Sequence, residues 1–146
     1  MTKTNRGFSL LELLIVVAII LIIATIAIPS LLRSRQVANE SAAVANIRTI
    51  NTAEVTYLSS SAGAYGAVGD LVTAGLLDTR FSNATGSGVS GYSYGITVFP
   101  GTYSVDAAAI STNNGRWAYS SGPDGVVRYT TTTALAPTGQ AGLPVQ

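Results

Sequence analysis

The chain has 146 residues, 47% of them apolar and 10% charged, and it contains no histidine and no cysteine. This length accommodates one long helix and one small domain. Without imidazole or thiol groups the chain lacks the usual catalytic bases and the usual transition-metal ligands, and a net charge of +1 gives no electrostatic reason to expect a nucleic acid partner. We therefore expect neither an enzyme nor a bound cofactor.

Residues 1–7 form a short polar stretch ahead of a long apolar run over residues 8–28. As a helix this run would be about 31 Å long, the thickness of the hydrocarbon core of a bilayer. Its aliphatic residues favour insertion by about 4–8 kcal/mol, and Glu12 opposes insertion by at most about 3 kcal/mol. The sequence therefore predicts a membrane-spanning helix over residues 8–29, with Glu12 as a candidate functional group.

Two ordinary explanations of this segment stay open. A secretory signal has a shorter apolar region followed by a small-x-small cleavage site, whereas this run is long, contains Glu12 and ends at Ile28 and Pro29. A plain N-terminal membrane anchor fits the length. It does not account for the pattern of residues at the start of the run.

That pattern consists of Lys3 and Arg6 followed by a motif at the start of the apolar run. The motif reads Gly7-Phe8-Ser9-Leu10-Leu11-Glu12-Leu13. It resembles the prepilin signature of type IV pilins and of the related pseudopilins of type II secretion, and the short leader is similar to that of the type IVa group. The resemblance implies that residues 1–7 are a leader peptide, that a prepilin peptidase cuts between Gly7 and Phe8, and that the same enzyme N-methylates Phe8.

Glu12 lies one helical turn after Phe8, so its carboxylate and the amine created by cleavage can face the same side. In a low-dielectric bundle of such helices, the two charges would offset each other's desolvation. The resemblance implies that Glu12 and Phe8 act in filament assembly. It also implies that the helix loosens near Pro29, for which an ordinary kink at the membrane exit is the alternative.

Residues 30–59 have the pattern of an amphipathic helix that continues the apolar run to about Ser59. Polar residues, among them Glu40, Asn51 and Glu54, separate the apolar positions. We expect one apolar stripe to pack on the following domain. Its members are Val37, Val44, Ile47, Val55 and Leu58.

Residues 60–130 have the pattern of a connector followed by a sheet. Asp70 is placed to cap a short helix over residues 71–74, which Gly75 would end. Alternating apolar positions and glycine-containing turns predict successive hairpins of an antiparallel meander with three or four strands. The expected strands are 92–98, 103–109, 116–120 and 126–130. The fold class is therefore α+β, a long N-terminal helix packed on an antiparallel sheet, which is the pilin fold that the resemblance implies.

Three further features complete the pattern. Residues 131–146 are expected to form a loose tail, without the disulfide that closes this region in many type IV pilins. Residues Asn83, Ala84 and Thr85 match a glycosylation sequon, although this short motif is frequent by chance. Asp124 is a weak candidate calcium ligand, since major pseudopilins carry a similar Asp-Gly turn, but a plain turn is the better explanation, because Pro-Asp-Gly is a favoured turn sequence without any metal.

The function that the resemblance implies is a structural subunit, a major pilin, which polymerises into a type IV pilus filament after leader cleavage. Its partners would be further copies of itself, the prepilin peptidase and the pilus assembly machinery. It would lie in the bacterial inner membrane as a single-pass precursor and then in the extracellular pilus. The alternatives are a type II secretion pseudopilin and a monomeric membrane-anchored binding domain.

Overall fold

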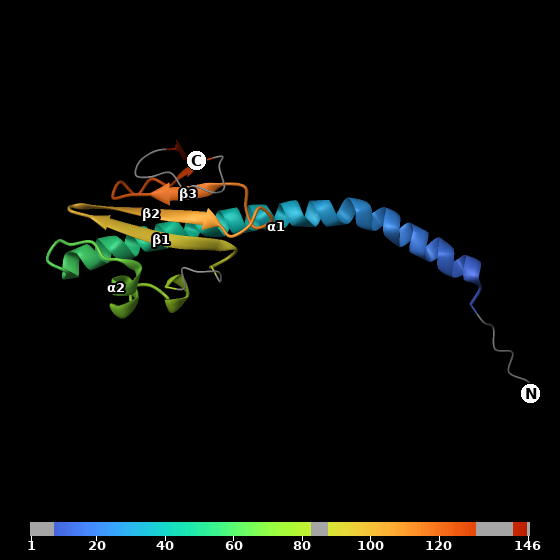
Figure 1. The fold of residues 1–146 in the computed structure, drawn as a ribbon, viewed down its shortest axis with the longest axis horizontal. Helices are drawn as coiled ribbons and strands as arrows, with labels where there is room; N and C mark the ends of the chain where they lie inside the picture. The colour runs from blue at the N-terminus through green and yellow to red at the C-terminus, as the bar shows by residue number, and fades with distance from the viewer. Residues whose placement is uncertain (1–7, 83–87, 131–141, 146) are drawn as a thin grey trace, which may run out of the picture. The chain divides into compact units, whose positions relative to one another are not determined.

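The computed structural model describes residues 8–82, 88–130 and 142–145 of the chain. A long helix is followed by an antiparallel sheet, which is the expected α+β fold (Figure 1). The elements are α1 (Leu10–Ser60), α2 (Val68–Thr73), the 3-10 helix η1 (Thr79–Phe81), and the strands β1 (Tyr92–Phe99), β2 (Thr102–Ala109), β3 (Ala118–Ser121), β4 (Arg128–Thr130) and β5 (Leu143–Pro144). The chain divides after Ser34 into two compact units, which are described separately below.

Helix α1 has 51 residues, close to the expected range of 8–59. It ends where Ala62 and Gly63 adopt positive φ angles of 56° and 86°, a conformation that glycine tolerates and that cannot continue a right-handed helix. The Gly63 amide donates to the Leu58 carbonyl at 3.1 Å, which satisfies one of the last helical acceptors. Pro29 lies inside α1 and does not interrupt it, so loosening of the helix near Pro29 stays a prediction.

The sheet is a meander with the strand order β1-β2-β3-β4-β5, and all its pairs are antiparallel. Residues Pro100 and Gly101 join β1 to β2, and Gly101 supplies the positive φ of 75° that this tight turn requires. The sheet has one strand more than the three or four expected. Strand β5 comes from the segment expected to be a tail, and the Val145 amide donates to the Val127 carbonyl at 2.8 Å.

Helix α2 begins three residues earlier than expected, at Val68. Asp70 acts from within the first turn, where its carboxylate accepts a hydrogen bond from the Ala67 amide at 2.9 Å. Gly75, with a φ of 71°, follows the end of the helix as the sequence predicts. The connector therefore contains the expected short helix, which begins three residues earlier than predicted.

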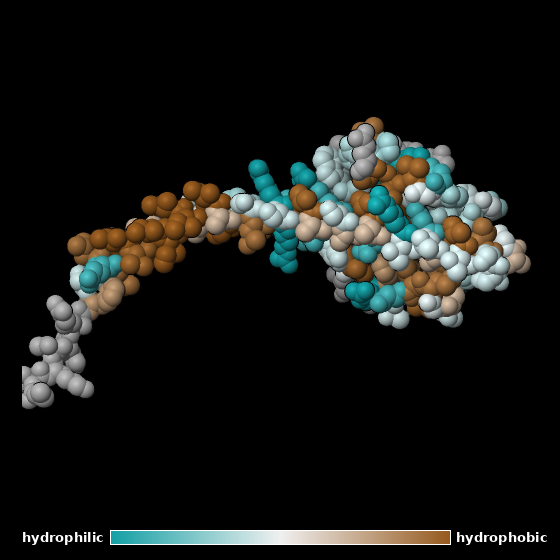
Figure 2. Space-filling model, turned by 180° about the vertical axis from the view of Figure 1, so that it is seen from behind, coloured by the Kyte–Doolittle hydropathy of each residue, from teal (hydrophilic) through white to brown (hydrophobic). Residues whose placement is uncertain are grey.

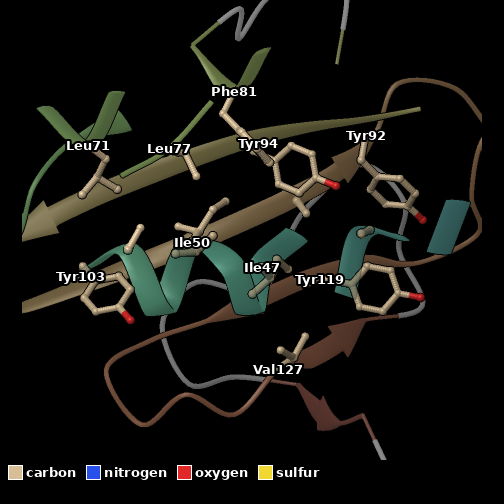
Figure 3. Packing of buried hydrophobic residues seen from close by; sticks show 14 residues of the cluster. Ile47, Ile50, Leu71, Leu77, Phe81, Tyr92, Tyr94, Tyr103, Tyr119 and Val127 are labelled. Atoms are coloured by element: carbon tan, nitrogen blue, oxygen red, sulfur yellow. The ribbon is translucent and has the colours of Figure 1, made fainter. Parts of the chain in front are cut away.

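The core of the domain lies between the second half of α1 and one face of the sheet (Figure 3). Ile47 and Ile50 of α1 are fully buried there. Four tyrosines of the sheet are buried in the same core, namely Tyr92, Tyr94, Tyr103 and Tyr119. The expected apolar stripe of α1 is wrong at two positions, because Val37 is 50% and Val55 is 61% exposed.

Candidate functional site along helix α1

The first part of α1 presents a long apolar surface in which Glu12 is the one charged residue. Every leucine, isoleucine and valine from Leu10 to Leu32 is exposed, and Figure 2 shows this segment as a mainly brown surface with a teal patch near its N-terminal end. Among the described residues, α1 is the one helix that is long and apolar enough to cross a membrane. Such a surface requires a cover of lipid or protein.

Glu12 is the only ionisable side chain between Phe8 and Leu32. Its carboxylate accepts a hydrogen bond from the Ser9 amide at 2.9 Å, and the Ser9 hydroxyl accepts one from the Leu11 amide at 3.2 Å. These contacts satisfy free amides at the start of α1. Phe8 precedes the helix and is 76% exposed, whereas Gly7 and the rest of the leader lie outside the described residues.

The second part of α1 carries a row of buried polar side chains that the expected apolar stripe does not include. Glu40, Asn51 and Glu54 are buried at 6%, 8% and 0% exposure. They share a helix face with Ile47 and Ile50, because Glu40 lies two turns before Ile47, and Asn51 and Glu54 each lie four residues after one of these isoleucines. We call these three residues the polar row. Each member contacts a different part of the domain.

Glu40 anchors the loop before β3. One carboxylate oxygen accepts hydrogen bonds from the main-chain amide of Arg116 at 2.8 Å and from its Nε at 3.2 Å. The other oxygen accepts one from Arg116 Nη2 at 3.1 Å. This two-pronged ion pair compensates the burial of the Glu40 carboxylate.

Asn51 joins two strands of the sheet. Its amide nitrogen donates to the Ser121 hydroxyl at 2.8 Å, and its oxygen accepts a hydrogen bond from the Tyr103 hydroxyl at 3.1 Å. Asn46 makes a related contact with the sheet, because its side-chain amide nitrogen donates to the Tyr94 hydroxyl at 2.9 Å. These hydrogen bonds satisfy polar groups that burial would otherwise penalise.

Glu54 is the least satisfied member of the polar row. One oxygen accepts a hydrogen bond from the Gly66 amide at 3.1 Å, and the other is buried without a partner among the described residues. Burial raises the pKa of the Glu54 carboxyl, the Gly66 hydrogen bond partly offsets this rise, and the nearby charge of Asp70 adds to it. Ionised Glu54 therefore costs the folded state free energy.

Stability is expected to rise as the pH falls from neutral toward about 4.5, the ordinary value for glutamate, because the folded state binds a proton at Glu54 before the unfolded state does. Asp106 contributes with the same sign, because burial also raises the pKa of its carboxyl. Urea unfolding of the full chain at several pH values measures the slope. Glu54→Gln should remove part of the slope and Asp106→Asn a further part, whereas an unchanged slope in Glu54→Gln would contradict the assignment.

Asp124, the candidate calcium ligand, lies in an ion pair. Its carboxylate accepts hydrogen bonds from Arg128 Nη2 at 2.7 Å and from the Val126 amide at 3.2 Å, and the Arg128 bond lowers the pKa of the Asp124 carboxyl. Among the described residues no group of three acidic side chains comes together that could hold a metal ion. These contacts are typical of a closed turn. The sequon at Asn83 lies outside the described residues.

Comparison with known proteins places the N-terminal segment in a known class. The family model described as the prokaryotic N-terminal methylation motif matches residues 2–28. The chain is 46% identical over 55 residues to the type IV major pilin protein PilA of Myxococcus xanthus, strain DK1622. That match covers 38% of this chain and 25% of the relative. No solved structure matches the chain significantly.

Proposed function

From the type IV pilin character of its N-terminal segment, we propose that this chain is a major pilin that polymerises into a pilus filament. The prepilin peptidase cuts between Gly7 and Phe8 and methylates the new amine of Phe8. The precursor is held in the bacterial inner membrane by residues 8–29. The assembly machinery then transfers it to the extracellular pilus, where further copies of the chain are its partners.

The observation that carries this proposal is the exposed apolar surface between Leu10 and Leu32. Lipid covers this surface before assembly, and the same segments of neighbouring subunits cover it afterwards. A surface of this size is too unfavourable to leave in water, since each exposed large aliphatic side chain costs about 1.5–3 kcal/mol relative to burial. Polymerisation therefore replaces the lipid around this surface with the apolar segments of neighbouring subunits.

Glu12 gives the assembled state its specificity in this proposal. In the filament interior its carboxylate pairs with the methylated amine of Phe8 from the same or a neighbouring subunit. A purely apolar helix could slide along its neighbours, whereas one buried charge pair fixes the position at which they meet. Type IV pilins are structural proteins, and this role needs no catalytic group.

Intact mass spectrometry of the chain purified from its membrane tests the proposal. We expect the loss of residues 1–7 and one added methyl group on Phe8, and electron microscopy of the culture supernatant should show filaments made of this chain. An uncut N-terminus would instead indicate a monomeric membrane-anchored domain. A cut and methylated chain that forms no pili and folds only with calcium would indicate a secretion pseudopilin.

A further inference from the structure

A pocket of about 210 Å³ lies beside the polar row of α1 and has walls that are mainly aromatic. It is lined by Glu40, Trp117, Tyr119, Tyr129 and Val145. The rings of Trp117 and Tyr129 meet edge to face with their centroids 5.5 Å apart. The pocket therefore combines electron-rich ring surfaces with a carboxylate that is only 6% exposed.

Glu40 is the only charged residue among the described residues of the lining, and its carboxylate attracts positive charge. The faces of aromatic rings also attract positive charge. The chain itself places a cation at this site, because the Arg116 guanidinium lies 5.5 Å from the centre of the Trp117 ring and pairs with Glu40 at 3.1 Å. The Arg116 side chain is 53% exposed, so its guanidinium is in contact with water while it pairs with Glu40.

We propose that this pocket binds a small organic cation of the alkylated ammonium class. The alkyl groups pack against the rings of Trp117 and Tyr129, the charge faces Glu40, and the Arg116 side chain moves into solvent to release the Glu40 carboxylate. Alkylated ammonium fits better than an anion, because an anion would meet the Glu40 carboxylate at the pocket wall. It fits better than a metal ion, because the described lining supplies only one carboxylate, whereas a hard cation such as calcium takes several oxygen ligands.

Trp117 makes the test direct, because it is the only tryptophan in the chain and its fluorescence reports on the pocket alone. The full chain in non-ionic detergent is titrated with choline at constant ionic strength. We expect saturable quenching or enhancement of the emission. The neutral tert-butyl analogue of choline, which has the same shape without the charge, should bind about three- to thirty-fold more weakly.

Substitutions in and beside the pocket should change the affinity for choline in predictable directions. Arg116→Gln removes the competing cation and keeps the main-chain hydrogen bond to Glu40, so choline should bind about two- to five-fold more tightly. Glu40→Gln and Tyr129→Leu should each weaken binding. Phe99→Leu, which removes an exposed ring at the end of β1, is the matched control and should bind choline as the unmodified chain does.

Three results would overturn the proposal. Equal binding of the neutral analogue would mean that the pocket recognises apolar shape only. Weaker choline binding in Arg116→Gln would mean that the guanidinium is part of the site and that the ligand is not a cation. The absence of any saturable change in Trp117 emission, in a chain whose circular dichroism shows the folded sheet, would mean that the pocket binds no such ligand.

Discussion

Replacing Glu12 with alanine is expected to abolish filament formation and to leave membrane insertion and leader cleavage intact. Insertion becomes easier, because a carboxylate at this depth opposes it. Assembly fails because the amine of Phe8 enters the filament interior without its counter-charge. Breaking a buried charge pair costs about 3–5 kcal/mol per contact, which corresponds to a loss of assembled subunits of roughly 150-fold to 5,000-fold.

The measurement is the ratio of subunits in sheared filaments to subunits in membranes, with intact mass confirming the cut before Phe8. Thr25→Ala is the matched control. The Thr25 hydroxyl donates to the Ile22 carbonyl of its own helix at 2.7 Å, so it needs no hydrogen-bond partner on a neighbouring subunit. The control should assemble normally. Filaments at the normal yield in Glu12→Ala would falsify the charge-pair account.

Replacing Gly115 with alanine is expected to destabilise the domain by about 3 kcal/mol, at the upper end of the range for overpacking. A Cβ atom at Gly115 would lie 2.6 Å from Cζ of Tyr92, whose side chain is fully buried. Moving the Tyr92 side chain away costs additional free energy, because its hydroxyl donates to the Trp117 carbonyl at 2.9 Å and this hydrogen bond would be lost. The displaced loop also holds Arg116, so the ion pair to Glu40 weakens at the same time.

Thermal unfolding of the full chain in non-ionic detergent, followed by circular dichroism, measures this effect. Gly95→Ala is the control, because a Cβ atom there meets nothing within 4 Å and the residue lies in β1 with an ordinary φ angle. The control should unfold within about 0.5 kcal/mol of the unmodified chain. If Gly115→Ala is as stable as Gly95→Ala, Tyr92 is less firmly held than its contacts indicate.

The elements were predictable because their signals are local. A long apolar run, alternation of apolar residues and glycine-containing turns each act over a few neighbouring positions, and they place α1, β1 and β2 within two residues of their bounds. Strand β5 was missed for the opposite reason. Two residues that include Pro144 carry no alternating pattern, and only pairing with β4 makes them a strand.

The polar row could not be predicted from the sequence, because what makes its burial possible lies far along the chain. Glu40 is buried because Arg116 reaches it, and Glu54 because the connector at Gly66 closes over it. By hydropathy alone such residues belong on the solvent side. The motif around Glu12 differs, because all its members are consecutive, so the sequence identifies the segment but not the neighbour it meets.

The polar row also bears on how a polymer keeps its shape. Apolar packing between a helix and a sheet tolerates a slip of one turn, about 5.4 Å, because similar side chains recur at that interval. Hydrogen bonds at Glu40, Asn51 and Glu54 span about 21 Å of the helix, and no slipped position satisfies all three. Every copy of the chain therefore carries its sheet at one fixed position along α1, and in the proposed filament positional error would not accumulate from subunit to subunit.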